Sequence, residues 1–255
     1  MKITFLGTGT SHGIPMIGCD CDVCCSEDKR DKRTRCSVYI ETKSASILID
    51  TAPEFRIQCL DNNIRKIDAI LFTHTHADHI VGLDDIRRFC ALQNSIITCY
   101  SYKNAIQSLK KIFSYAFMEM GQNYSERPRL KAQIIDAPFT INDLEITPLE
   151  LYHGTELIYG YRIGRFAYCT DCSAIPEQTM NKLRGLDVLV LDALRYTPHP
   201  THFNVKQALE AADKIKAKTT YLTHIAHEIK HSELEPKLPP SISLAYDSLQ
   251  LTIDD

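Results

Sequence analysis

The segment THTHADHIVG, which begins at residue 73, gathers the side chains best suited to binding metal ions. His74, His76 and His79 lie within six positions, with Asp78 between the last two. The apolar run DAILFT directly precedes these three imidazoles and the carboxylate, which are side chains that a hydrophobic core does not favour. Imidazole and carboxylate together suit zinc, manganese, iron or nickel. A polar loop with a capping aspartate is the alternative interpretation, but an isolated helix cap does not need three histidines.

Three more candidate ligands follow later runs that are predicted to be strands. His153 comes just after LEITPLEL, Asp171 follows FAYC, and His224 follows TTYLT. Each is a weak signal alone, because a single histidine after a strand is more often an ordinary surface or core residue. Active sites of α/β folds commonly lie at strand ends, so we expect these side chains to join the first cluster. A carboxylate such as Asp171 can bridge two cations, which lie about 3.5 to 4 Å apart in two-metal sites.

A second metal-binding pattern, GCDCDVCC, begins at residue 18 and places four cysteines in eight positions. Cys19, Cys21 and Cys24 supply three thiolates, and His227, three residues beyond the last candidate ligand above, is the candidate for the fourth position. Such a Cys₃His set has the ligand count of a closed, structural zinc site. Cys25 is then spare, and we expect it to be buried. Reduced cysteines in an ordinary loop are the alternative, because C-x-C-x-x-C alone is weaker than paired C-x-x-C motifs.

The elements that must position these residues alternate along the chain. Short β-rich runs such as KITFLG, SVYIE and DVLVLDAL are separated by stretches whose apolar residues recur every three or four positions. This interleaving predicts an α/β fold, with sheets covered by helices, in a single domain over residues 1–255. The segment 102–129 is interpreted as an insertion with a mobile tail. Helices are predicted at about residues 54–62, 79–93, 102–120, 177–184 and 205–217.

Composition excludes several classes of protein. A net charge of −3 over 255 residues argues against broad affinity for nucleic acid or an anionic membrane. The first residues lack the pattern of a signal peptide, and no apolar run approaches the roughly 18 residues of a membrane span. We therefore expect a cytoplasmic protein. Its ten cysteines are then reduced and are candidate metal ligands or small packing residues rather than a disulfide framework.

The order His-x-His-x-Asp-His, then His, Asp and His, resembles the metallo-β-lactamase superfamily over essentially the whole chain. Within it, LGTGTSHGIP, GCDCDVC and THTHADHIVGLDD look like the PhnP-type phosphodiesterases, which are cyclic-phosphate hydrolases associated with the carbon–phosphorus lyase pathway. The resemblance implies a four-layer αββα sandwich and supports the same four ligands for the structural zinc. It also implies one metal ion held by His74, His76 and His153, and a second held by Asp78, His79 and His224, with Asp171 bridging them.

The resemblance also implies roles around the two metal ions, which we expect to be zinc, manganese or iron. Asp50, in ILIDTAP, matches an aspartate that orients a ligand histidine through its other ring nitrogen. His202, in HPTHFNVKQALE, resembles a histidine that contacts phosphate and donates a proton to the leaving oxygen. Capping the helix that follows, or packing against it, is the alternative role for His202. We count His202 and Asp78 as catalytic residues, and we assign no role to His12 or His199.

We therefore expect a metal-dependent enzyme that attacks small or cyclic phosphodiesters with a metal-bridging hydroxide. A transfer-RNA 3′-processing endonuclease is the nearest rival, but it usually carries a basic, glycine-rich arm that this sequence lacks. A lactone or thioester hydrolase would share the metal motif without the early cysteines. A metal-binding regulatory protein would be expected to have lost a ligand. The expected partner is a small phosphodiester, and segment 102–129 is a candidate contact surface for a homodimer.

Overall fold

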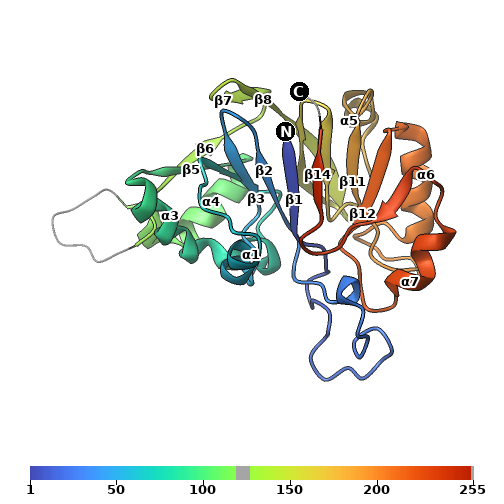
Figure 1. Ribbon diagram of the computed structural model, residues 1–255. Helices are drawn as coiled ribbons and strands as arrows, with labels where there is room; N and C mark the ends of the chain where they lie inside the picture. The colour runs from blue at the N-terminus through green and yellow to red at the C-terminus, as the bar shows by residue number, and fades with distance from the viewer. Residues whose placement is uncertain (119–126, 254–255) are drawn as a thin grey trace.

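The computed structural model describes residues 1–118 and 127–253, and within them the strands form two seven-stranded sheets (Figure 1). The first sheet has the order β14 (Gln250–Thr252), β1 (Lys2–Gly7), β2 (Ser37–Glu41), β3 (Ser46–Ile49), β4 (Ala69–Leu71), β5 (Ile97–Ser101) and β6 (Leu130–Ile134). The second has the order β13 (Ile242–Leu244), β12 (Thr219–Thr223), β11 (Val188–Asp192), β10 (Phe166–Cys169), β9 (Glu156–Ile163), β8 (Leu144–His153) and β7 (Phe139–Ile141).

Helices cover the outer face of each sheet (Figure 1). The first sheet carries α1 (Phe55–Asp61), α3 (Ile86–Gln93) and α4 (Lys103–Ile112), and the second carries α5 (Glu177–Lys182), α6 (Val205–Ile215) and α7 (His231–Leu234). The short α2 (Ala77–Ile80) carries part of the histidine motif. Short 3₁₀ helices in the described residues are η1 (Lys29–Asp31), η2 (Val81–Asp85), η3 (Ser114–Ala116) and η4 (Glu235–Lys237).

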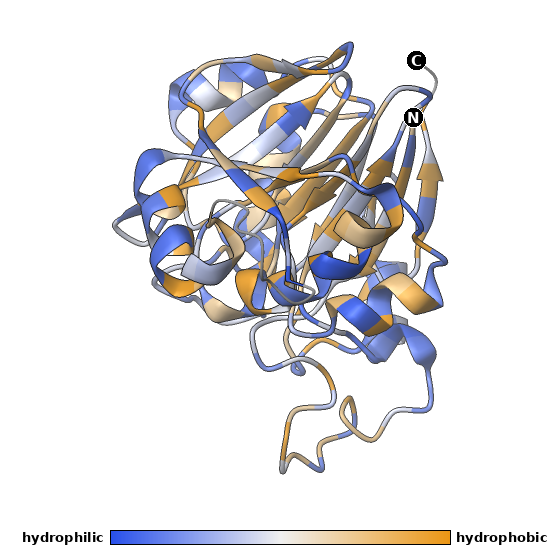
Figure 2. Ribbon diagram, turned by 90° about the vertical axis from the view of Figure 1, so that its left-hand side faces the viewer, coloured by the Kyte–Doolittle hydropathy of each residue, from blue (hydrophilic) through white to orange (hydrophobic). Residues whose placement is uncertain are grey.

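Alternation along the strands decides which layer each side chain enters. In β3, Ile47 and Ile49 pack between the two sheets, whereas Leu48 packs against the helices of the first sheet. In β11, Val190 packs between the sheets and Leu191 against α6 and its neighbours. All five side chains are fully buried, and burying each contributes about 1.5–3 kcal/mol. The orange strand interiors in Figure 2 show this apolar centre. The predicted four-layer αββα sandwich is therefore confirmed.

The boundaries of two predicted helices differ from the structure. The stretch 79–93 is not one helix, because it is divided into α2, η2 and α3. In the described part of the stretch 102–120, the α-helix ends with α4, because Phe113 leaves the helical region with φ −110° and ψ 42°, and the 3₁₀ turn η3 follows. In the described part of segment 102–129, α4 is the crossover between the parallel strands β5 and β6. Its predicted mobile tail lies largely in residues 119–126, outside the described residues.

Strand direction places the candidate ligands at one edge of the sandwich. Strands β3 to β6 run parallel to one another, and so do β10 to β13. Strand β8 is antiparallel to β9, which is antiparallel to β10, so β8 and β10 point the same way. The two sheets meet at this edge, where the N–H of Tyr159 donates to the carbonyl of Thr73 at 2.9 Å. None of the described helices is long and apolar enough to cross a membrane.

Candidate metal centre

The histidine motif occupies the turn between β4 and α2, where the buried strand ends. His74 and His79 are buried, His76 is exposed, and Asp78 is partly buried in the first turn of α2. The motif thus presents its side chains in two directions, as the alternating spacing predicts. Its members join ligands from other strands to form two separate clusters.

The first cluster consists of His74, His76 and His153, whose nearest ring nitrogens all lie within 4.8 Å of one another. His153 is the last residue of β8, so the second sheet supplies this ligand. The ring centroids of His74 and His76 are 4.6 Å apart, and those of His76 and His153 are 5.1 Å apart. Three imidazoles that converge in this way are the first predicted ligand set.

The second cluster consists of Asp78, His79, Asp171 and His224. Asp171 contacts both histidines, with Oδ2 lying 3.3 Å from Nε2 of His79 and Oδ1 lying 3.2 Å from Nε2 of His224. A further grouping of Asp171 with His153 connects this carboxylate to the first cluster. Asp171 therefore lies where a bridging ligand between two cations would have to lie.

Three of the buried histidine nitrogens in these clusters are better satisfied by cations than by hydrogen bonds within the protein. The Nε2 atoms of His74, His79 and His224 are buried and make no hydrogen bond within the described residues. Asp171 lies 3.2–3.3 Å from two of these nitrogens without completing a hydrogen bond, and leaving a buried polar atom unsatisfied costs about 1–3 kcal/mol. A pair of divalent cations satisfies these nitrogens together with the carboxylates of Asp78 and Asp171. The residues present therefore fit two metal ions.

The opposite nitrogens of the ligand histidines are held by neighbouring groups. Asp50 Oδ2 accepts from Nδ1 of His79 at 2.8 Å, which is the contact that the family resemblance implied. The carbonyl of Thr201 accepts from Nδ1 of His153 at 2.9 Å. Such outer contacts fix the tautomer and direct Nε2 toward the metal site. They also raise the basicity of the ligand.

The backbone is strained at three of the site residues. Asp50, Asp171 and His224 have φ values of 62°, 56° and 60°, in the left-handed region that costs a residue with a side chain about 1–3 kcal/mol. Asp50 directly follows β3, and His224 directly follows β12. Asp171 lies two residues after the end of β10. The sharp change of direction aims the side chain into the centre rather than along the sheet.

Proton binding in the metal-free protein differs between the two clusters. Burial lowers the pKa of His74 well below its usual value, so this ring is neutral and ready to bind a cation. Burial also acts to lower the pKa of His79, but the carboxylates of Asp171, Asp78 and Asp50 outweigh it and raise that pKa well above 6.5. A cation that binds His79 must therefore displace a proton.

His202 lies beside both clusters without belonging to either predicted ligand set. Its ring centroid is 4.7 Å from that of His153 and also 4.7 Å from that of His224, on which it stacks. The side chain precedes α6, whose own cap is Asn204 in a capping box with Gln207. The cap role considered for His202 is therefore filled by Asn204. Burial lowers the pKa of His202, so its ring is neutral in the metal-free protein at neutral pH.

Asp192 is a functional candidate that the sequence analysis missed. This fully buried carboxylate, the last residue of β11, accepts from Nδ1 of His202 at 3.0 Å and lies 3.5 Å from Nδ1 of His224. It thus positions both the candidate acid and one metal ligand. The signal was present, because an acidic residue ends the run DVLVLD just as Asp171 follows FAYC.

The cysteine pattern forms a third cluster. Sγ atoms of Cys19, Cys21 and Cys24 lie 3.3, 3.3 and 3.8 Å from Nδ1 of His227. The N–H of Cys24 donates to Sγ of Cys21. This hydrogen bond is the largest cause that lowers the pKa of Cys21, which falls to about 6, and the lower pKa favours the thiolate that a metal binds. The four residues fit a tetrahedral structural zinc. Cys25 is not part of this cluster and is exposed rather than buried, which corrects that expectation.

Comparisons with known proteins agree with this geometry. The family profile of the β-lactamase superfamily domain matches residues 45–225. A curated octanoyltransferase from Porphyromonas gingivalis is 38% identical over 100% of this chain, but the chain spans only 52% of that relative. The octanoyltransferase name therefore describes a protein about twice as long as this chain.

Two solved structures extend the comparison to the fold. The crystal structure of a new diphosphatase from the PhnP family is 42% identical, with a TM-score of 0.92, and the match covers 99% of this chain and 98% of that one. Human tRNase Z, short form, is 18% identical with a TM-score of 0.71 over 100% of both chains, a likeness of fold alone. The profile match, the paired sheets and the converging histidines and carboxylates lead to one conclusion: this chain belongs to the metallo-β-lactamase superfamily, within which it is similar to the PhnP family.

Proposed function

We propose that the chain hydrolyses small phosphodiesters, including cyclic ones, in a centre that binds two divalent cations. The position of His202 is the observation that carries this proposal. The ring lies equally close to His153 in one cluster and to His224 in the other, so a phosphoryl group bound across both clusters would have an imidazole beside it. The similarity to a PhnP-family diphosphatase supports a phosphorus-centred substrate.

Two cations of zinc, manganese or iron, held by the seven ligands described above, would lower the pKa of a water and neutralise charge on the phosphoryl oxygens. The chain's own residues would do the remaining work. Asp50 and the carbonyl of Thr201 hold His79 and His153 in the tautomer that leaves Nε2 free for a cation. Asp192 holds His202 so that its Nε2 faces away from Asp192. This preorganisation means that little reorganisation is needed during the reaction.

His202 would contact the phosphoryl group and deliver a proton to the leaving oxygen. Its pKa is lowered by burial in the metal-free protein, but a phosphoryl anion next to Nε2 favours the imidazolium and opposes that shift. Its hydrogen bond to Asp192 stabilises the positive charge in the same way. Proton donation would therefore be coupled to substrate binding.

A transfer-RNA 3′-processing endonuclease is the second candidate, because a ribonuclease Z from Clostridioides difficile is 24% identical over 78% of this chain. Two observations favour a small substrate instead. The net charge is −3, which is unfavourable for holding a polyanion. Residues 119–126 read EMGQNYSE and contain no lysine or arginine, so they do not provide a basic arm.

A substrate panel tests the proposal. The metal-loaded chain is assayed on bis(p-nitrophenyl) phosphate, a 2′,3′-cyclic nucleotide, a lactone, a thioester and a precursor transfer RNA. We expect turnover of the two small phosphodiesters and none of the carbonyl substrates. Turnover of the lactone or thioester with inert phosphodiesters would refute the proposal, and processing of the precursor RNA alone would favour the endonuclease.

A further inference from the structure

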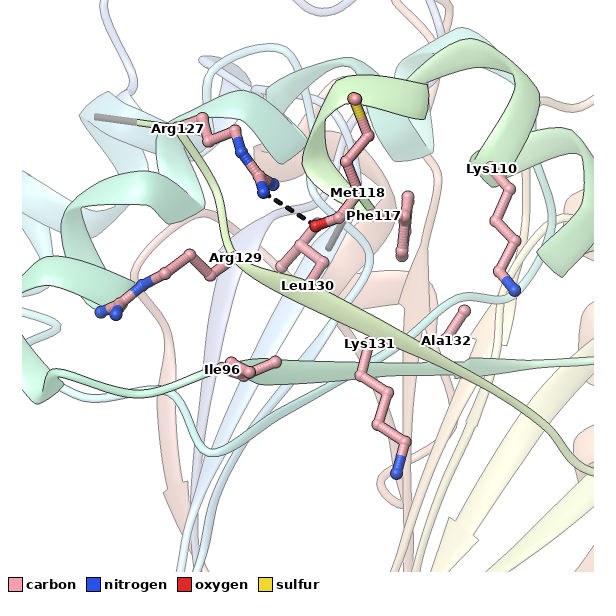
Figure 3. Close-up of a pocket in the computed structure, with 9 residues that line it drawn as sticks. All are labelled: Ile96, Lys110, Phe117, Met118, Arg127, Arg129, Leu130, Lys131 and Ala132. Carbon is pink, nitrogen blue, oxygen red and sulfur yellow. Dashed lines mark hydrogen bonds between the residues drawn. The ribbon is translucent and has the colours of Figure 1, made fainter. Parts of the chain in front are cut away.

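Arg33, between η1 and β2, is a buried cation. Its side chain is 1% exposed and is among the largest fully buried side chains of the protein. Cations elsewhere in the chain lie at the surface. Lys110 and Lys131, for example, are exposed in the wall of a cavity of about 390 Å³ beside α4 and β6 (Figure 3). Because burying a charge is costly unless its hydrogen bonds are satisfied, we looked for the groups that Arg33 holds.

The guanidinium of Arg33 joins three segments that are far apart in sequence. Nη1 donates to Oγ1 of Thr8 at 2.8 Å and to the carbonyl of Ala245. Nη2 donates to Nδ1 of His231, the first residue of α7, at 3.2 Å. A planar guanidinium reaches several acceptors in fixed directions, which a flexible lysine does not. Burial lowers the pKa of Arg33 to about 10, so the side chain stays charged at neutral pH.

Two carboxylates belong to the same network. Oδ1 of Asp247 accepts from Oγ1 of Thr8 at 2.7 Å. Asp31 is fully buried and accepts from the N–H of His231 at 2.7 Å. The negative charges of Asp247 and Asp31 oppose the effect of burial on the pKa of Arg33. The network therefore offsets part of the cost of the buried charge.

Thr8 connects this network to a metal ligand. The carbonyl of Thr8 accepts from the N–H of Ile225 at 2.9 Å, and the carbonyl of Ile225 accepts from the N–H of Thr10 at 3.1 Å. Ile225 directly follows His224, whose φ of 60° lies in the left-handed region. A residue with a side chain keeps this conformation only where the surrounding structure holds it. The loop after β1 therefore holds the peptide that directs His224 into the second cluster.

This loop fits closely between the Arg33 segment and the turn after β12. Gly9 forms a bridge with Arg35 on one side and with Ile225 on the other. A Cβ atom on Gly9 would lie 2.8 Å from the carbonyl oxygen of Arg33, so only glycine allows the two backbones to approach this closely. A shift of the Arg33 segment would therefore also move the turn that carries His224.

We propose that Arg33 is a positioning residue for the cation of the second cluster, because it holds His224 in place through Thr8. This inference rests on the proposed centre of two cations. The first cluster takes its ligands from the turn after β4 and from the end of β8. Loss of Arg33 should therefore weaken the cation of the second cluster more than that of the first.

Stepwise binding of Mn²⁺, which disfavours thiolate sites, tests this role. Metal-free wild type, Arg33→Met and Thr8→Val are titrated by calorimetry, and electron paramagnetic resonance distinguishes a single bound Mn²⁺ from a coupled pair. Arg33→Met removes the charge with all its hydrogen bonds, whereas Thr8→Val removes only the hydroxyl that links Arg33 to the loop. Arg30→Met is the matched control, because Arg30 is an exposed arginine in the same segment.

We expect wild type and Arg30→Met to bind two Mn²⁺ per chain as a coupled pair. In Arg33→Met, one of the two affinities should fall by about 10-fold or more, the usual effect of losing a contact outside the ligands, and the other should stay close to that of wild type. The resonance signal should then shift toward single ions. Thr8→Val should show the same selective loss to a smaller extent, and it decides the test if circular dichroism shows that Arg33→Met does not fold.

Equal weakening of both affinities, or unchanged binding in either folded variant, would overturn the positioning role through Thr8. A wild-type chain that binds fewer than two Mn²⁺ would refute the two-cation centre itself. If wild type binds two Mn²⁺ and the selective loss is seen, but no phosphodiester is hydrolysed, the proposed function fails while the role of Arg33 stands.

Discussion

At the scale of single residues, the metal centre depends on how each imidazole is held. His79 is fixed through Nδ1 by Asp50, and His153 through Nδ1 by the carbonyl of Thr201. In both rings the hydrogen bond at Nδ1 fixes the ring orientation and therefore the direction of Nε2. His202 is held in the same way by Asp192, although it is not a predicted ligand. The proposed proton donor and two of the candidate ligands are therefore positioned in the same way, by an acceptor on Nδ1.

Replacing Asp192 should affect catalysis through both of its histidine neighbours. We expect Asp192→Ala to lower kcat for a phosphodiester by about 10- to 100-fold, the usual cost of removing such an outer contact. Because Asp192 also lies near His224, metal affinity measured by competition with a chelator should fall as well. Asp213→Ala, an exposed aspartate on α6, is the control. Unaltered kcat in Asp192→Ala would show that Asp192 positions neither ring.

Replacing His202 separates proton donation from phosphate contact. The p-nitrophenolate of bis(p-nitrophenyl) phosphate is a stable anion that leaves without a proton, whereas the alkoxide of a 2′,3′-cyclic nucleotide needs one. His202→Ala should therefore lower kcat by about 10²- to 10⁴-fold on the cyclic nucleotide and by a smaller factor on the aryl diester, with the metal content unchanged. An equal loss on both substrates would indicate a contact role alone. A loss of bound metal would indicate that His202 is a ligand.

The raised pKa of His79 predicts that metal binding depends on pH. In the metal-free protein this ring is protonated at neutral pH, so a binding cation releases its proton, and affinity rises as pH rises toward that pKa. Calorimetric titration with Mn²⁺, which disfavours thiolate sites, in buffers of different ionisation enthalpy measures the release. Asp50→Asn removes one carboxylate that raises the pKa and should reduce the protons released at pH 7. Identical release in the variant and wild type would contradict this account.

The residues of the site differ in how well sequence predicted them. The histidine motif is local, so its spacing alone indicated a metal site. His153, Asp171 and His224 could be placed because each follows a recognisable strand. Asp192 satisfied the same rule and was overlooked.

At the scale of elements, the cysteine cluster connects segments about two hundred residues apart. The N-terminal loop supplies Cys19, Cys21 and Cys24, and the turn after β12 supplies His227. His224, in that same turn, belongs to the second metal cluster. A zinc at the cysteines would therefore hold the N-terminal loop against the turn that carries His224.

Replacing Cys21 should remove this zinc. Cys21→Ser should contain one zinc less per chain by elemental analysis. A destabilisation of about 2 kcal/mol, within the usual range for a single substitution, would lower Tm by roughly 4–8 °C in a chain of this size. Cys25→Ser is a closely matched control, because Cys25 is nearby but exposed. A full zinc complement in Cys21→Ser would show that no structural zinc is bound there.

The elements themselves were predicted where their periodicity is strong. Helices α1, α5 and α6 end within two residues of the predicted ranges, and the long central strands were all recognised. Strands β6, β7, β13 and β14 were missed, because they are short and lie at or near sheet edges, where half-exposed side chains weaken the apolar pattern. The predicted 79–93 helix is divided because tertiary contacts override local periodicity here. The short α2 must place Asp78 and His79 beside Asp171 and His224.

At the scale of the whole molecule, two sheets packed face to face bring strand ends from both halves of the chain to one edge. The first half supplies the histidine motif and Asp50, and the second supplies His153, Asp171 and His224. Neither half contains a complete ligand set, so the centre can form only when the two sheets have packed. Metal binding and folding of the sandwich should therefore be thermodynamically coupled.

A metal titration combined with an assay of phosphodiester hydrolysis tests directly whether the histidine–carboxylate centre hydrolyses phosphodiesters with two bound cations. The chain is stripped with a chelator, reloaded with zinc or manganese in steps, and assayed on bis(p-nitrophenyl) phosphate while bound metal is measured at each step. We expect no turnover in the stripped chain and full turnover when the histidine–carboxylate centre holds two ions. A chain that holds those ions, leaves the diester intact and hydrolyses a lactone or a thioester would contradict it.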